Sequence, residues 1–289
     1  DGDSADPLLE GTGAIVFVDV PLPPATGSLL PRIAALGADA FTPSWLRERI
    51  VSTDSAGVQH ASVLKVPVIR DRPIRIGPPL LRQRLLDLNG CCNGAHTRAV
   101  INQPDGLFVS QRFAIDFVQL GDGTATFSGD PRNNESYFLY GADALAVSAG
   151  RIVDVRDGIE QNVPGEPLPP AQLDTAAGNY VIEELDDGHF ALYAQLQPGS
   201  LRVVAGDHVS RGEVLGLVGN SGNSTEPHLH FQVMDRGSPF DADGLPYLFE
   251  RFQLLGRVDL NSPELPFTKT VGSALRGQRL PLAGDVIGF

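Results

Sequence analysis

The clearest candidates for chemistry are two histidines, His228 and His230, separated by one residue. Residues 228–234 alternate in character, which predicts a β-strand. Side chains two residues apart on a strand point to the same face, so the two imidazoles are expected to share one surface. Two imidazoles presented in this way can bind one zinc ion or serve one reacting group, and a carboxylate from another strand would complete the site.

The stretches around this pair resemble a known family. Residues 218–231 contain a Gly-Asn-Ser-Gly turn, a short spacer and then Pro-His-Leu-His-Phe, while residues 112–117 read Arg-Phe-Ala-Ile-Asp-Phe. Four further stretches match in the same order, at residues 141–153, 178–182, 192–196 and 204–212. On these motifs, residues 141–235 are similar to the core of the lysostaphin-type (LytM-like) zinc metalloendopeptidases, and residues 112–117 match the segment that carries that family's first two metal ligands.

The resemblance implies roles for individual residues. Asp116 and His230 would be zinc ligands, and His228 would assist the attacking water or stabilise the oxyanion. Two positions depart from the family pattern, because Arg112 stands where the first histidine ligand is expected and Gln195 where a second catalytic histidine is expected. Arginine is a poor zinc ligand, and glutamine can donate a hydrogen bond to an oxyanion but cannot shuttle a proton. Without metal, Arg112 is expected to pair with Asp116.

Two hypotheses follow, and they leave open whether the protein is an enzyme. In the first, the site is degenerate, and the protein acts on or binds peptidoglycan peptides in the cell envelope or regulates another cell-wall hydrolase. The alternative is an active zinc endopeptidase with a rebuilt metal site, in which His96 supplies the missing ligand beside Asp116 and His230. Peptidoglycan or a peptide is the expected partner in both cases.

The pattern of strands and turns predicts a mostly β protein. Residues 14–20 and 61–69 are β-branched runs that suggest strands of an N-terminal β-rich domain, and residues 43–51 suggest one short helix between them. From residue 95 onward, turns such as Asp186-Asp187-Gly188 separate alternating runs, which favours an antiparallel β-sheet. Residues 159–177 suggest a long loop.

Three domains are expected from this organisation. Residues 1–90 would form the N-terminal β-rich domain, to which no motif attaches a role. Residues 91–240 would form the antiparallel, LytM-like peptidase domain, and residues 241–289 a C-terminal β extension that packs on the body.

Composition excludes some classes of protein. The net charge of −13 argues against a nucleic-acid binder, because phosphate binding depends on clustered Lys and Arg. No stretch approaches the roughly 18 apolar residues of a membrane span, and the chain starts at Asp1 rather than at Met. We therefore expect a trimmed chain that has lost its targeting segment. The family resemblance implies that the protein is secreted or lies in the cell envelope.

The only two cysteines, Cys91 and Cys92, are adjacent. Their spacing excludes a disulfide between distant loops of one chain. A disulfide between neighbours, two thiols and a metal-binding pair all remain open.

Overall fold

Two units make up the chain. A computed structural model describes residues 45–53, 57–67, 74–91, 95–168 and 172–289. Contacts between Cα atoms divide the chain into residues 1–72 and 73–289, so the segment 73–90 lies in the second unit. Domain limits at residues 90 and 240 stay predictions, as does a separate N-terminal domain.

The described part of the first unit is a β-hairpin. Strand β1 (Trp45–Thr53) pairs antiparallel with β2 (Gln59–Pro67), from Trp45 opposite Pro67 to Thr53 opposite Gln59. The short helix predicted over residues 43–51 is therefore wrong, because pairing with a distant segment prevails over local helix signals. The strand predicted over 61–69 is confirmed for its described part, and the run at 14–20 lies outside the described residues.

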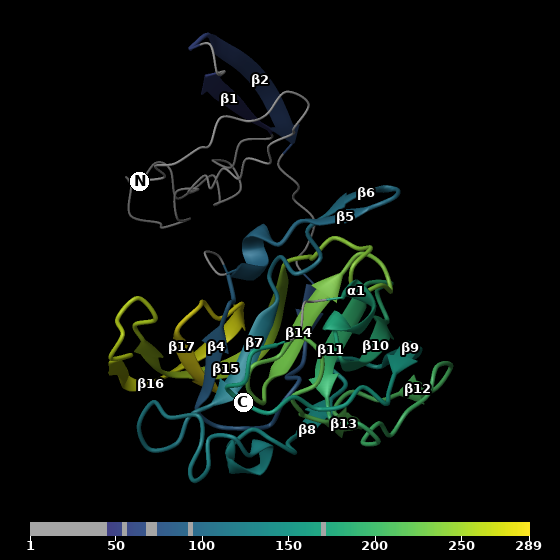
Figure 1. Cartoon of the computed structure of the whole chain (residues 1–289), viewed down its shortest axis with the longest axis vertical. Helices are drawn as coiled ribbons and strands as arrows, with labels where there is room; N and C mark the ends of the chain where they lie inside the picture. Colours follow the sequence, from purple (N-terminus) through teal and green to yellow (C-terminus); the bar gives the residue numbers. More distant parts are fainter. Residues whose placement is uncertain (1–44, 54–56, 68–73, 92–94, 169–171) are drawn as a thin grey trace, which may run out of the picture. The chain divides into compact units, whose positions relative to one another are not determined.

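The second unit is built on one 11-stranded sheet, shown in Figure 1. Its strands follow the order β12-β9-β10-β11-β14-β7-β4-β17-β15-β16, with β3 beside β15. All pairs are antiparallel except β3 with β15. The strands are β3 (Ile74–Ile76), β4 (Leu85–Leu88), β7 (Ile115–Gln119), β9 (Gly150–Arg156), β10 (Asn179–Leu185), β11 (Phe190–Leu196), β12 (His208–Val209), β14 (Leu229–Met234), β15 (Tyr247–Val258), β16 (Phe267–Arg279) and β17 (Asp285–Gly288). The described residues are thus mostly β, as predicted.

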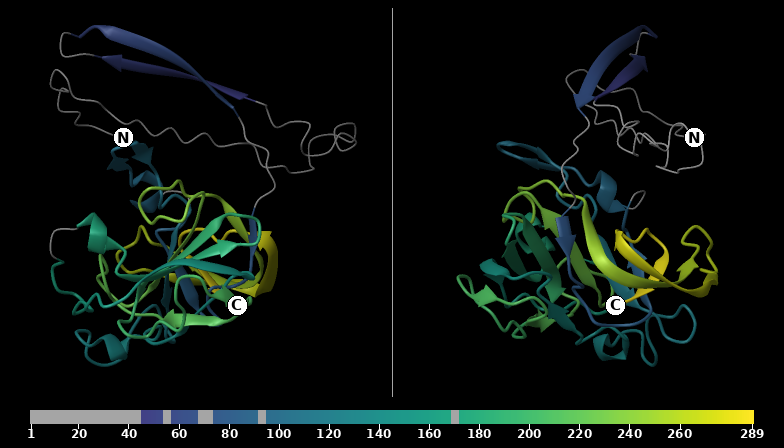
Figure 2. Two further views of the ribbon diagram at one scale, coloured as in Figure 1. Left: turned by 90° about the vertical axis from the view of Figure 1, so that its right-hand side faces the viewer. Right: turned by 180° about the vertical axis from the view of Figure 1, so that it is seen from behind.

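Smaller elements surround this sheet. Two more antiparallel pairs are β5 (Ile101–Gln103) with β6 (Gly106–Phe108), and β8 (Asp143–Leu145) with β13 (Val214–Leu217). The short helices are the 3-10 turns η3 (Ala95–Arg98) and η4 (Asn134–Ser136), and α1 (Leu173–Ala176), which lies inside the loop predicted over 159–177. Figure 2 shows the β5–β6 hairpin protruding from the body of this unit. Among the described residues, no helix is long and apolar enough to cross a membrane.

The β10–β11 hairpin follows the sequence signal closely. Its turn lies at Asp186-Asp187-Gly188, where Gly188 has φ +85°, a conformation that glycine adopts without a steric cost. Strand β14 likewise covers the predicted run 228–234 except for its first residue. Both hairpin strands and β14 are neighbours in the sheet, and β14 lies directly beside β7.

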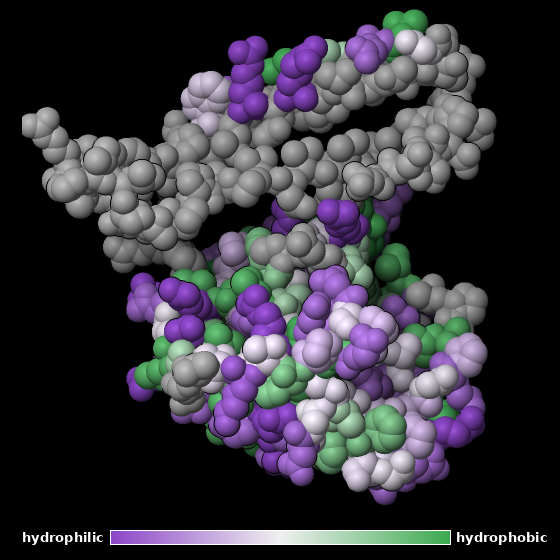
Figure 3. Space-filling model, turned by 90° about the vertical axis from the view of Figure 1, so that its left-hand side faces the viewer, coloured by the Kyte–Doolittle hydropathy of each residue, from purple (hydrophilic) through white to green (hydrophobic). Residues whose placement is uncertain are grey.

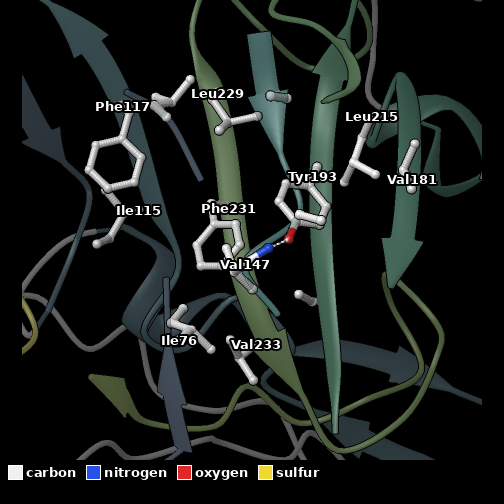
Figure 4. Packing of buried hydrophobic residues seen from close by; sticks show 14 of the residues in the cluster. Ile76, Ile115, Phe117, Val147, Val181, Tyr193, Leu215, Leu229, Phe231 and Val233 are labelled. Atoms are coloured by element: carbon white, nitrogen blue, oxygen red, sulfur yellow. Dashed lines mark hydrogen bonds between the residues drawn. The ribbon is translucent and has the colours of Figure 1, made fainter. Parts of the chain in front are cut away.

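The main hydrophobic core covers one face of the sheet. Tyr193, Phe231 and Phe117 come from three neighbouring strands and are fully buried in this cluster, as Figure 4 shows. The Tyr193 hydroxyl accepts a hydrogen bond from the Val147 backbone N–H at 2.8 Å, so its polar atom is satisfied within the core. The face of the second unit seen in Figure 3 mixes hydrophilic and hydrophobic side chains.

Two smaller clusters lie on the other face of the sheet. Leu192 and Ala194 of β11 belong to one, and Leu86 of β4 and Val118 of β7 belong to the other. Between these strands runs β14, whose His230 pairs with Ala194 on one side and Asp116 on the other. The polar residues in the middle of this face are therefore enclosed between two apolar clusters.

Candidate metal centre

Strand register brings Asp116 and His230 together. They are direct partners across the β7–β14 pairing, and Nδ1 of His230 lies 2.8 Å from Oδ1 of Asp116. Their neighbours in the two strands, Ile115, Phe117 and Phe231 among them, are fully buried in the main core. Because successive strand residues face opposite ways, burying these neighbours directs Asp116 and His230 to the other face.

His96 reaches the same carboxylate from helix η3. Its Nε2 lies 3.3 Å from Oδ2 of Asp116, and its ring packs edge-on against that of His230 at 4.9 Å between centroids. One ligand atom from each of His96, Asp116 and His230 lies within 4.8 Å of the others, and all three residues are buried. Two imidazoles and one carboxylate at this spacing form a donor set of the type that binds zinc.

The far ring nitrogens of the two imidazoles face oxygen acceptors. Nδ1 of His96 lies 3.4 Å from the Ala114 carbonyl, and Nε2 of His230 lies 2.8 Å from Oε1 of Gln232. When the other nitrogen of each ring ligates a metal, these nitrogens carry the proton and the carbonyl or amide oxygen accepts it. The other nitrogens then present lone pairs toward Asp116, as metal binding requires.

Charge states favour the same chemistry. Burial lowers the pKa of His96 to about 4, so the ring is neutral near pH 7. Burial alone would raise the pKa of Asp116, but His228 and His230 beside it hold that pKa well below its usual range. A neutral imidazole and an ionised carboxylate are the forms that bind zinc, so these residues fit the metal.

His228 lies at the edge of the cluster in the opposite tautomer to His230. Its Nδ1 is 2.8 Å from the Glu226 carbonyl and 3.1 Å from Oγ of Ser224, and its Nε2 is 3.4 Å from Oδ1 of Asp116. Since the carbonyl only accepts, Nδ1 donates and Nε2 of the neutral ring is free to take a proton. Burial would lower the pKa of His228, but the charge of Asp116 raises it overall.

The loop before His228 is held tightly in place. Gly222 has φ +74°, and a Cβ there would lie 2.4 Å from the backbone nitrogen of Gly178, so this turn requires glycine. Nδ2 of Asn162 donates to the carbonyls of Gly222 and Ser224, at 2.8 and 2.9 Å. The hydrogen bonds of the loop therefore position the Ser224 hydroxyl against His228.

The two positions that depart from the family pattern differ in burial, because Arg112 is exposed and Gln195 is buried. The ion pairs of Asp116 are with His96, His228 and His230, so the expected Arg112–Asp116 pair is wrong. Phe113, with φ +67°, ends the turn that contains Arg112 and separates it from β7. Gln195 is buried beside Ala194, the partner of His230, and its Oε1 has no hydrogen-bond partner in the described structure.

Two polar contacts of the cluster escaped the sequence reasoning. Gln232 accepts from His230, and Asn89 donates from Nδ2 to Oδ2 of Asp116 at 2.9 Å. A signal for Gln232 was present, because it stands two residues after His230 on the same strand face. Asn89 carried no such signal, since its contact depends on β4 pairing with β7.

Two carboxylates that flank the histidine pair in the sequence have partners of their own. The carboxylate of Glu226 accepts from Oγ1 of Thr126 at 2.9 Å, and that of Asp235 accepts from the backbone N–H of Asp243 at 2.7 Å. Neither carboxylate therefore orients an imidazole of the cluster. Cys91 is disulfide-bonded, which excludes it as a thiolate ligand.

Comparison with known proteins points to one family. Residues 138–242 match the family described as Peptidase family M23. This segment contains His228 and His230, whereas Asp116 and His96 lie before it.

Individual relatives match over short segments. The peptidoglycan DD-endopeptidase ShyA of Vibrio cholerae is 41% identical over 66 residues, which cover 23% of this chain and 15% of ShyA. Endolysin 2638A of Staphylococcus phage 2638A is 29% identical over 144 residues, covering 44% of this chain and 29% of the endolysin. The matches thus span less than a third of either relative. Among solved structures, the lysostaphin catalytic domain from Staphylococcus simulans is 26% identical to this chain. The match covers 43% of this chain and 86% of that domain. Its TM-score is 0.27, which is too low for the structural overlay to support an argument.

Proposed function

We propose that this chain is a zinc endopeptidase of peptidase family M23 whose metal is held by His96, Asp116 and His230. The observation that carries the proposal is the approach of His96 to the Asp116–His230 pair. It fills the ligand position that Arg112 leaves vacant in the family pattern. If the third ligand were missing, the alternative would be a module that binds peptidoglycan without cleaving it.

Zinc would supply Lewis acidity at this site, polarising the scissile carbonyl and lowering the pKa of the attacking water. His228 takes the proton from that water through Nε2, because its Nδ1 is committed to the Glu226 carbonyl. The same imidazole then returns the proton to the leaving amine. One histidine makes both transfers, since glutamine at position 195 cannot exchange protons in this way.

Gln195 keeps a supporting role in this proposal. Its side-chain amide can donate a hydrogen bond to the oxyanion that forms when the carbonyl is attacked. The backbone of Gln195 is held on both sides, since its N–H donates to Ala177 at 3.0 Å and its carbonyl accepts from Gly219 at 3.1 Å. A rigid backbone here limits the positions the amide can take.

We place the substrate among the peptides of peptidoglycan and the protein in the cell envelope. The support is the family match together with relatives described as a peptidoglycan DD-endopeptidase and an endolysin. Binding to peptidoglycan without cleavage is the alternative function, and it is one of the outcomes of the test below.

The test combines metal content with turnover. The full chain is purified without chelator, its zinc is measured by mass spectrometry, and amino groups released from isolated peptidoglycan are followed over time. We expect one zinc per chain and new amino groups, and we expect both to be lost in His230→Ala. The control is His189→Ala, which changes a half-buried histidine that is paired with Asp187, away from the metal site. A wild-type chain that takes up no zinc even after reconstitution overturns the proposal, and retention on peptidoglycan without release of amino groups favours the binding module.

A further inference from the structure

Asn89 contacts the carboxylate at the centre of the cluster. Its Nδ2 donates to Oδ2 of Asp116 at 2.9 Å; the Asp116 carboxylate is buried and Asn89 is half-buried. We propose that Asn89 is a positioning residue of the metal site, whose amide holds the Asp116 carboxylate in the orientation that receives the ion. This inference rests on the proposed zinc function.

The backbone at Asn89 is bent to make this contact. Leu88 pairs with Asp116 across β4 and β7, so a continued strand would point residue 89 toward the opposite face. Asn89 instead has φ +55°, in the left-handed region, which turns the chain at the end of β4. Asparagine tolerates this conformation better than most residues, and it also supplies the amide.

The two oxygens of Asp116 have different neighbours. Oδ1 faces His230 and His228, at 2.8 and 3.4 Å. Oδ2 faces Asn89 at 2.9 Å and His96 at 3.3 Å. Three of these four neighbours are imidazoles, and Asn89 is the one amide among them.

That difference matters when a metal binds. An imidazole that ligates zinc must present a lone pair, so His96 and His230 cannot also donate a hydrogen from the ligating nitrogen to Asp116. The amide of Asn89 does not titrate and keeps its hydrogens. Its hydrogen bond is therefore the contact that orients Asp116 both before and after the imidazoles bind the ion.

Two variants separate the amide from the backbone turn. Asn89→Gly keeps a residue that accepts positive φ and removes the amide, while Asn89→Asp keeps the shape and replaces the donor with an acceptor. The matched control is Gln278→Gly, which places glycine at an exposed position of positive φ in β16. Zinc affinity is measured by competition with a chromophoric chelator on the folded, full-length chain.

We expect zinc affinity to fall about 10–100-fold in both Asn89 variants and to stay within about twofold of wild type in the control. If Asn89→Gly is not folded by circular dichroism, the isosteric Asn89→Asp decides. Wild-type affinity in a folded Asn89 variant overturns the inference and leaves the zinc function intact. Absence of zinc from the wild-type chain overturns the proposed function instead, so the two failures are distinguishable.

Discussion

His230 lies directly opposite Asp116 across the β14–β7 pairing, and their side chains meet at 2.8 Å. Both belong to neighbouring strands in the interior of the sheet, so the separation of their backbones is set by strand register. A slip of one residue would turn every side chain of the slipped strand to the other face. The two residues are thus positioned by the same register that buries Phe231 and Phe117 in the core.

His96→Ala tests the origin of the third ligand. We expect zinc affinity to fall by more than about 100-fold, because a lost ligand costs more than the 10–100-fold of a lost supporting contact. Arg112→Ala is the control, since this side chain is exposed and makes no ion pair with Asp116. Chelator competition measures both variants. Loss of zinc in Arg112→Ala with retention in His96→Ala would contradict the assignment.

His228→Gln separates proton transfer from metal binding. Zinc content should match the wild type, while release of amino groups from peptidoglycan should slow by about 100- to 10,000-fold, the usual contribution of general acid–base catalysis. His208→Gln, which changes an exposed histidine in β12, should leave both unchanged. An unchanged rate in His228→Gln would show that another group moves the proton.

Gln232→Leu removes the acceptor behind His230. The Oε1 atom that accepts from Nε2 is lost, so Nδ1 is no longer held as the lone-pair nitrogen, and zinc affinity should fall about 10–100-fold. Gln232→Glu keeps an acceptor oxygen and should retain affinity. Gln119→Leu on the neighbouring strand β7 serves as the control. Equal affinity in Gln232→Leu and Gln119→Leu would rule out this role.

Glu183 gives the fold a pH dependence that is separate from the metal site. Burial raises its pKa from 4.5 to about 7, while its contacts with Tyr193 and Val147 oppose the shift. Between these values the folded state binds more protons than the unfolded state, so the free energy of unfolding falls as pH rises from about 4.5 to 7 and then levels off. We expect a loss of about 1–3 kcal/mol across this window.

Urea unfolding of the metal-free chain at pH 5 and pH 8 measures this effect. Glu183→Gln should remove the Glu183 part of the pH dependence and be the more stable protein at pH 8. Glu184→Gln changes the next residue, whose half-buried carboxylate pairs with Arg151, and should retain the wild-type dependence. Parallel pH dependence in the wild type and Glu183→Gln would refute the prediction.

Local signals in the sequence predicted the parts of the fold that depend on neighbouring residues. The Asp186-Asp187-Gly188 turn predicted the hairpin of β10 and β11, and alternation after His228 predicted β14. A helix is predicted over 43–51, but the described part of this segment belongs to β1, because local propensity does not reveal its pairing with the later strand β2.

The residues of the site also differ in whether local sequence signals could predict them. The shared face of His228 and His230 could be predicted from their spacing, and Asp116 from the resemblance around residues 112–117. His96 was a hypothesis because its distance from Asp116 along the chain says nothing of the 3.3 Å between them. Asn89 was missed because its contact needs both the β4–β7 pairing and a left-handed turn, and neither is visible in residue types alone.

The position of His96 on a short 3-10 helix, outside the paired strands, has a mechanical consequence. Asp116 and His230 are already joined through the backbone of adjacent strands, whereas His96 belongs to a separate segment. An ion shared by all three would therefore act as a staple that fastens residues 95–98 to the sheet. Taking the ion away would release that segment first and leave the strands paired, so metal occupancy and resistance to proteolysis near residue 96 would rise and fall together.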